Sequence, residues 1–144
     1  MERLVGSFTP YIKFEKMNKK IVLTGAILIV ASIVLGAFGA HALREVLLPK
    51  DLASFETGVR YQMYNGLALL AMGLNANAFG FSLKWVFNLM LAGVILFSAS
   101  IYGLSLDVLL GMEFKFLGPI TPLGGLLMIF GWFSLIFKLV QSKK

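Results

Sequence analysis

Cysteine is missing from this sequence, histidine occurs once, and charged residues are scarce. The lack of cysteine excludes disulfides, thiolate metal ligands and cysteine nucleophiles. A single imidazole, that of His41, cannot form the two-histidine zinc site of the His-Glu-x-x-His type. The chain also has no Gly-x-Ser-x-Gly nucleophile elbow and no Gly-x-x-x-x-Gly-Lys phosphate loop. We therefore expect no catalytic residue, no metal and no cofactor.

Apolar residues are abundant in place of the missing polar ones. Of the 144 residues, 58% are hydrophobic and 14% are charged. Soluble domains have about 45–50% apolar and about 25% charged residues. A chain of this length is expected to form one domain, and its excess of apolar surface needs lipid as the surrounding solvent. The composition predicts an integral membrane protein.

Four long apolar segments account for this excess, at residues 21–40, 61–81, 85–106 and 121–140. Each has roughly the 20 residues that cross ~30 Å of hydrocarbon as an α-helix. Strands of a membrane barrel would instead alternate in polarity over about ten residues. The predicted fold class is all-α, a four-helix transmembrane bundle over residues 21–140. A basic N-terminal segment (1–20) precedes it and a short tail (141–144) follows.

The connections between the spans have their own signals. Residues 41–60 are polar, but some apolar positions recur at helical spacing, which indicates an interfacial helix leading into the second span: Leu52, Phe55 and Val59. Only residues 82–84 separate the second and third spans, which predicts a tight antiparallel hairpin. Thr121 is the expected N-cap of the fourth span, with Pro122 at the first helical position.

The start of the chain allows two alternatives. The basic residues before the first span and Ala40-His41-Ala42 after it fit a cleaved signal peptide. Signal h-regions are usually ~7–15 residues long, and this apolar run is longer, so we favour a retained span. Met17 begins a shorter version of the chain, Met-Asn-Lys-Lys, directly before the first span. Residues 1–16 are not expected to be essential to the fold.

The basic residues predict which way the spans run. Nine lysines and arginines lie at the N-terminus, in the 82–84 turn and at the C-terminal end, against four in the 41–60 and 107–118 connections. Basic residues are enriched on the cytoplasmic side of spans. Both termini are therefore predicted to lie in the cytoplasm. The same membrane topology explains the net charge of +6 without a nucleic-acid partner.

Two charged pairs stand at four-residue spacing near the outer end. His41 and Glu45 would share a face if the first helix continued, and could form a proton-responsive pair. We favour a polar helix end in the interface, because exposed pairs contribute only ~0–1 kcal/mol. Glu56 and Arg60 are likewise expected to form a surface pair.

The second span carries amides that need partners in hydrocarbon. Gln62 and Asn65 share a helical face near the outer third of the membrane, and Ser98 and Tyr102 share a face of the third span. With His41, these four residues are the candidate ligand or interhelical contacts. Interhelical hydrogen bonds are the favoured interpretation, and a ligand or ion site is the alternative. No charged side chain lies well inside a predicted span, which counts against a proton-driven transporter.

Small residues at four-residue spacing are expected to let helices approach closely. In the first span they are Ser32, Gly36 and Ala40, and in the fourth Thr121 and Gly125. The spacing indicates helix packing, within the chain or between copies.

Four segments in order resemble a known family. They are Gly36-Ala-Phe-Gly-Ala-His-Ala-Leu43, Tyr61-Gln-Met-Tyr-Asn-Gly-Leu-Ala-Leu-Leu70, Leu96-Phe-Ser-Ala-Ser-Ile-Tyr102, and Leu117-Gly-Pro-Ile-Thr-Pro-Leu-Gly-Gly125 with Gly131-Trp132. Together they resemble the small membrane family called domain of unknown function 423, related to animal transmembrane protein 256, over about residues 19–137. The resemblance implies a four-helix inner-membrane protein and supplies no catalytic residue. Family members often have His where this chain has Asn65, and Gly where it has Ala42, so histidine chemistry at position 65 is not expected here.

The functional expectation follows from these absences. The leading hypothesis is a non-enzymatic membrane component that binds lipid or another membrane protein, including another copy of itself. The alternative is a small transporter or channel that uses the Gln62 and Asn65 face. An enzyme ranks third, because no activated nucleophile or acid–base dyad is found.

Overall fold

The computed structural model describes residues 17–142 of the chain. Four long helices account for most of them: α1 (Lys19–Ala40), α2 (Pro49–Leu74), α3 (Lys84–Leu110) and α4 (Ile120–Gln141). Short 3-10 turns lie in the three connections: η1 (Leu43–Glu45), η2 (Ala76–Phe79) and η3 (Lys115–Leu117). Residues 17–142 contain no strand, so the predicted all-α class is confirmed. The predicted segment before residue 17 and the last two residues of the tail lie outside the described part.

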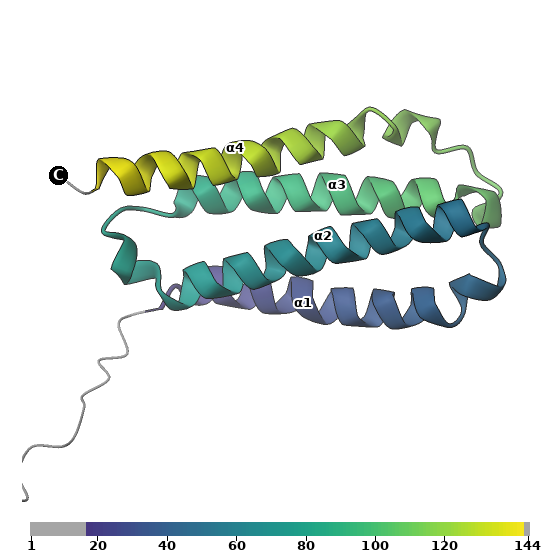
Figure 1. Ribbon diagram of the computed structural model, residues 1–144, viewed down its shortest axis with the longest axis horizontal. Coiled ribbons are helices and arrows are strands. Elements are labelled where there is room, and N and C mark those ends of the chain that lie inside the picture. The colour runs from purple at the N-terminus through teal and green to yellow at the C-terminus, as the bar shows by residue number, and fades with distance from the viewer. Residues whose placement is uncertain (1–16, 143–144) are drawn as a thin grey trace, which may run out of the picture.

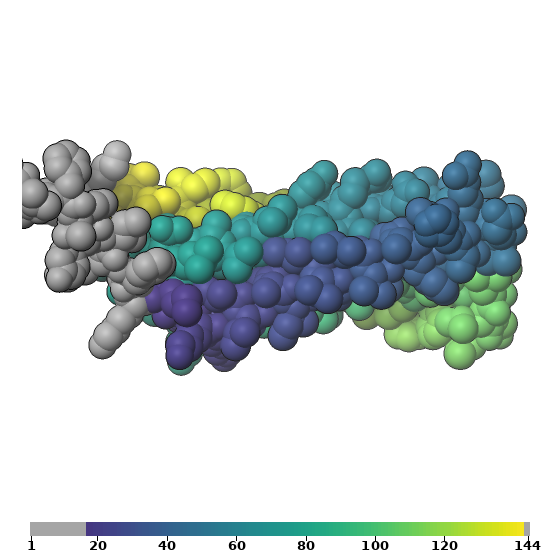
Figure 2. Space-filling model, turned by 90° about the horizontal axis from the view of Figure 1, so that it is seen from below, coloured from purple at the N-terminus to yellow at the C-terminus, as the bar shows by residue number. Residues whose placement is uncertain are grey.

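The helices run antiparallel in chain order, as Figure 1 shows, with α1 and α4 at the two edges of the view. The extensive contacts join consecutive helices, α1 with α2, α2 with α3, and α3 with α4. The outer helices therefore keep most of their apolar side chains uncovered by protein. Figure 2 shows α1 along one face of the molecule, where Ile27 and Val34 are more than half exposed.

Local sequence explains where the helices begin and end. Asn18 caps α1, with its side-chain oxygen accepting from the Ile21 N–H at 3.3 Å. Gly111 ends α3 in a left-handed conformation, at φ 62°, where a side chain would be strained. Thr121 was predicted to cap α4, and this is wrong, because the helix begins at Ile120 and its N-cap is Pro119. Pro122 nevertheless lies in the first turn, where a missing N–H costs nothing.

Helix α2 differs most from its predicted range. It was expected over residues 61–81, but it begins at Pro49 and ends at Leu74. Pro49 occupies the first helical position, and the expected interfacial helix of residues 41–60 is continuous with the span. The helix ends at Leu74, and the Asn75 side chain that follows donates to the Ala71 carbonyl at 2.9 Å. The expected tight hairpin is thus a longer connection that spans residues 75–83 and includes η2 and Gly80, which has a positive φ of 66°.

Charge distinguishes α2 from the other three helices. Within residues 17–142, three helical segments are long and apolar enough to cross a membrane, and they contain α1, α3 and α4. The first half of α2 carries four charged residues instead: Lys50, Asp51, Glu56 and Arg60. The depth of each helix in the bilayer therefore stays a prediction, and α2 is the helix for which hydropathy gives the least support.

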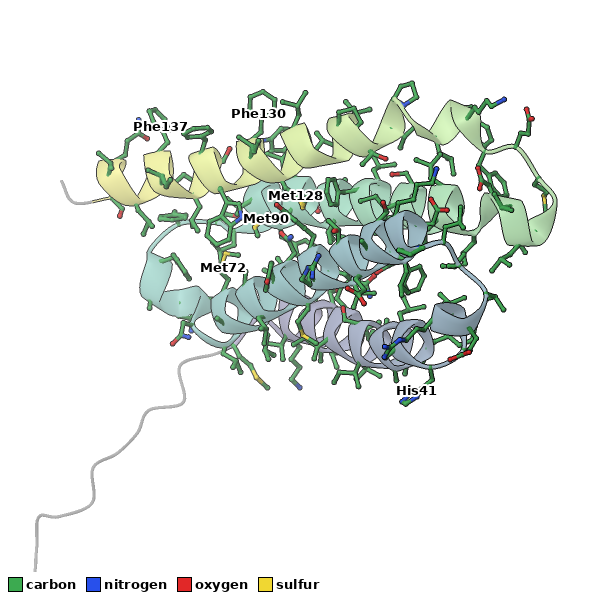
Figure 3. All side chains as sticks on the ribbon, turned by 45° about the vertical axis from the view of Figure 1, so that its right-hand side comes forward. His41, Met72, Met90, Met128, Phe130 and Phe137 are labelled. Atoms are coloured by element: carbon green, nitrogen blue, oxygen red, sulfur yellow. The ribbon has the colours of Figure 1, made fainter. Side chains whose placement is uncertain are left out.

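The core lies toward one end of the bundle. Its buried cluster draws apolar side chains from all four helices and from Leu83 in the turn before α3, including Met72, Met90 and Leu135. In Figure 3, Met72, Met90 and Met128 point inward between the helices, while Phe130 and Phe137 point away from α4. Phe79 and Phe81 of the connection pack against the cluster. These apolar residues were predicted to belong to the second span, and they contribute to the core instead.

Candidate functional site

Gln62 joins three helices through its side-chain amide. It is buried on α2, where its nitrogen donates to the Leu28 carbonyl of α1 at 3.1 Å. Its oxygen accepts from the Tyr102 hydroxyl of α3 at 2.9 Å. Both ends of the amide are therefore bonded within the protein, as the interhelical interpretation expects.

Asn65 lies one turn further along α2 and is only half satisfied. Its nitrogen donates to the Tyr61 carbonyl at 2.9 Å and contacts the Met128 sulfur of α4 at 3.1 Å. Only the nitrogen can face the Tyr61 carbonyl favourably, so this fixes the orientation of the amide. Its oxygen is buried without a partner. An unpaired amide oxygen costs free energy in an apolar interior, which makes Asn65 the least stabilised of the buried amides.

Gln62 and Asn65 lie beside the middle of α1. Gln62 bonds to Leu28 near the centre of α1, and a side chain on Gly66 would meet Ile29 of the same turn. Because α2 begins at Pro49, Gln62 and Asn65 lie well inside the helix instead of at its start. Their depth near the outer third of the membrane stays a prediction.

Ser98 and Tyr102 fasten α3 to α2 near the Gln62 contact. The Ser98 hydroxyl donates to the Gly58 carbonyl at 2.9 Å. The Tyr102 ring packs on Phe55 with centroids 4.9 Å apart. Three of the predicted contact residues, Gln62, Ser98 and Tyr102, are thus brought together on the interface between α2 and α3, while Asn65 points toward α4.

The fifth candidate, His41, is not part of this arrangement. It follows the last residue of α1, is exposed, and points away from the bundle in Figure 3. Because the helix ends at Ala40, His41 and Glu45 do not share a helical face, and no hydrogen bond or ion pair joins them among the described residues. Glu56 and Arg60 do pair, at 4.0 Å, with both side chains about half exposed.

Two contacts were missed by the sequence analysis. The Ser100 and Thr121 hydroxyls lie 2.7 Å apart and join α3 to α4. The other contact is glycine packing, in which a side chain on Gly25 would lie 2.7 Å from the Gly66 carbonyl, and one on Gly124 would lie 2.8 Å from the Gly93 carbonyl. Repeats of seven residues, such as Gly66 with Gly73, could have indicated these positions. The predicted Ala40 is exposed.

Among the hollows on the surface of residues 17–142, three bear on function. The apolar groove, of about 730 Å³, lies between α3 and α4 and is lined by Trp85, Leu89, Phe130, Phe133, Ser134, Ile136, Phe137 and Val140. The basic-end pocket, of about 550 Å³, lies between the start of α1, the η2 connection and the start of α3. A third hollow of about 430 Å³ is lined by Asp51, Ser54, Ser105 and Thr121 among others. None of the three is lined by Gln62 or Asn65.

The described residues also bear on metal binding. Within residues 17–142, no three histidine, aspartate or glutamate side chains gather closely enough to hold a metal ion. Of the buried polar side chains, Gln62, Ser98 and Ser100 bond to neighbouring helices, whereas the Asn65 oxygen and the Ser105 hydroxyl have no partner among the described residues.

Four antiparallel helices of the described part, three of which lie in segments long and apolar enough to cross a membrane, define a helical membrane protein. Residues 35–125 match the family described as Protein of unknown function (DUF423). The chain belongs to this family, and the resemblance drawn from its motifs is confirmed.

The chain is also similar to several staphylococcal proteins named as membrane proteins. It is 40% identical over 120 residues to UPF0382 membrane protein SH2409 of Staphylococcus haemolyticus, covering 83% of this chain and 94% of that protein. It is 37% identical over 123 residues to a UPF0382 membrane protein of Staphylococcus epidermidis, covering 85% and 97%. No solved structure matches the chain. These similarities support a membrane protein and assign no activity.

Proposed function

We propose that the protein is a non-enzymatic component of the membrane that binds lipid, with an acyl chain in the apolar groove. The observation that supports this proposal is the apolar lining of the groove. Seven of its eight lining residues are apolar, none is charged, and Ser134 is the one polar member. Trp85, Phe133 and Phe137 leave more than half of their surface uncovered by protein.

The surroundings of the groove argue for lipid as the occupant. It lies on α3 and α4, both of which are long and apolar enough to span a bilayer. The solvent at that depth is hydrocarbon, and a membrane has no water with which to fill the groove. We therefore commit to lipid over another membrane protein, the partner that the sequence left open.

The contacts of Gln62 count against the alternative of a transporter or channel. A transport path along this face would need amide groups that face water or a ligand. Gln62 instead uses both ends of its amide for Leu28 and Tyr102. A flux assay in reconstituted vesicles tests the alternative, and selective transport that is lost in Gln62→Leu would favour it.

The location in the cell follows from charge. Four lysines and no acidic residue of the described part lie at the end of the bundle where α1 begins and α4 ends: Lys19, Lys20, Lys84 and Lys138. This end is proposed to face the cytoplasm, with the protein in the cell inner (plasma) membrane.

The acyl-chain proposal is tested by filling the groove. Ser134→Trp places a large side chain among the lining residues, and Leu126→Trp is the control, because Leu126 is half exposed on α4 but does not line the groove. Native mass spectrometry of the purified variants, with phosphatidylcholine added at limiting amounts, measures the lipid retained. We expect a several-fold loss for Ser134→Trp and little change for Leu126→Trp. Equal retention by both variants would contradict the proposal.

A further inference from the structure

The two ends of the molecule carry different charges. At the end formed by the start of α1, the η2 connection and the end of α4, the charged residues of the described part are four lysines. At the opposite end, basic residues are mixed with all five acidic residues of the described part: Glu45, Asp51, Glu56, Asp107 and Glu113. An anion approaching the first end therefore meets cations without competing carboxylates from residues 17–142.

The basic-end pocket opens at this lysine-rich end. Its polar lining comes from the side chains of Asn18, Lys20, Asn77, Ser82, Lys84 and Asn88. Its apolar lining includes Ile21 and Phe87, both of which belong to the buried core cluster. The pocket thus combines ammonium groups and amide donors with an apolar wall that continues into the bundle.

Two of the lysines are held against aromatic rings. The Lys20 ammonium lies 5.5 Å from the centre of the Phe87 ring, on the pocket wall. Lys138 lies 5.5 Å from the centre of the Phe81 ring and donates to the Ser82 carbonyl at 3.1 Å, which fixes the loop that forms one side of the pocket. Lys20 and Lys84 are the two lysines among the residues that line the pocket.

We infer that the basic-end pocket binds the phosphate of an anionic phospholipid headgroup. Lysine is a strongly hydrated point charge that binds phosphate, and amide N–H groups complete such a site with neutral donors. The starts of α1 and α3 lie beside the pocket and add the positive ends of their dipoles. The apolar wall suits the first carbons of the lipid below the phosphate. The inference deepens the proposed lipid binding and rests on it for the lipid source of the phosphate.

The test compares charge removal at the two ends. Lys20→Gln with Lys84→Gln removes the two pocket charges, and Lys50→Gln with Lys115→Gln removes the same charge from the opposite end. Protein in nanodiscs or mixed micelles is titrated with phosphatidylglycerol and with phosphatidylcholine. A lysine near an anionic surface contributes roughly fivefold in affinity, so we expect the pocket variant to lose up to about 25-fold for phosphatidylglycerol. Phosphatidylcholine binding should change little, as should both affinities in the control.

Three results would overturn the inference. The first is an unchanged phosphatidylglycerol affinity in the pocket variant, and the second is an equal loss in the control. The third is displacement of the lipid by millimolar inorganic phosphate, which would assign the pocket to a free anion. If the double Lys→Gln variant does not fold, two other variants replace it. Lys20→Arg with Lys84→Arg keeps both charges and should retain the preference for phosphatidylglycerol over phosphatidylcholine. The single Lys84→Gln variant should lose part of this preference. The headgroup inference can fail while the proposed function holds. In that case the protein would show no preference for phosphatidylglycerol, and a lipid acyl chain would still occupy the apolar groove.

Discussion

The closest approaches within the helix pairs α1–α2 and α3–α4 bring a glycine against the backbone of the partner helix, whereas the close neighbours at the α2–α3 interface are side chains. A side chain on Gly25 would lie 2.6 Å from the Leu70 amide nitrogen. The α2–α3 interface instead holds the Tyr102–Gln62 hydrogen bond and the Phe55–Tyr102 ring contact. The Tyr61 ring also packs on Phe97 there, with centroids 4.8 Å apart.

The difference matters because backbones cannot move aside as side chains can. Where glycine brings two helices into backbone contact, any added atom must separate them. Where aromatic and amide side chains meet, rotamer changes absorb part of a substitution. The pairs α1–α2 and α3–α4 are therefore expected to be rigid units. The α2–α3 interface between them is expected to tolerate more substitutions.

The largest effect is expected at Asn65, where α2 meets α4 at the middle height of the bundle. Asn65→Asp places a carboxylate beside Met128, and a charged group at a helix centre costs ~2.5–3.5 kcal/mol on insertion scales. Asn65→Leu should be nearly neutral, because it removes an oxygen that already lacks a partner. Thermal unfolding in detergent measures both variants. A stable Asn65→Leu protein that loses its cellular function would favour the ligand-site alternative.

A smaller effect is expected at Gly124, in the tight α3–α4 contact. A methyl group there would meet the Phe97 amide nitrogen and the Gly93 carbonyl, so Gly124→Ala should cost about 1–3 kcal/mol. The neighbouring Gly125→Ala is the control, because its added carbon would meet only the Phe97 ring at 3.7 Å. That control should be neutral or stabilising by up to ~1 kcal/mol, since alanine favours helix over glycine. Similar melting temperatures for the two variants would refute the rigid-pair description.

The smallest effect is expected at the polar interface between the pairs. Removing the Tyr102–Gln62 hydrogen bond should cost about 0.6–1.7 kcal/mol, the range of interhelical bonds in membranes. A double-mutant cycle with Tyr102→Phe and Gln62→Leu measures this coupling directly. If the coupling energy between Tyr102 and Gln62 exceeded the cost of Gly124→Ala, the α2–α3 interface would be less tolerant of substitution than the α3–α4 glycine contact. That result would contradict the comparison.

The fold could be predicted from the sequence largely because continuous apolar runs have one solution in lipid. The ends of α2 were the exception. Residues 41–60 were predicted to hold an interfacial helix leading into the second span, but α2 is one helix that begins at Pro49. The predicted span also ran to residue 81, because average hydropathy did not detect that α2 ends at Leu74.

The contact residues were predicted better than their partners. Gln62, Ser98 and Tyr102 were identified as polar groups that need partners, and they do form interhelical bonds. Two of the acceptors, at Leu28 and Gly58, are backbone carbonyls and leave no trace in the side-chain sequence. The close glycine contacts were missed because four-residue spacing was sought, while Gly66 and Gly73 are seven residues apart.

The proposed orientation, with four helices crossing the membrane and the basic end in the cytoplasm, is tested most directly by cysteine labelling. The chain has no native cysteine, so single substitutions report one position each. Lys50→Cys and Glu113→Cys mark the mixed-charge end, and Asn77→Cys and Ser142→Cys mark the basic end. With a membrane-impermeant maleimide on intact cells, we predict labelling at positions 50 and 113, and labelling at 77 and 142 only after permeabilisation. Equal labelling at 50 and 77 in intact cells would show that α2 does not cross, and the reverse pattern would invert the proposed orientation.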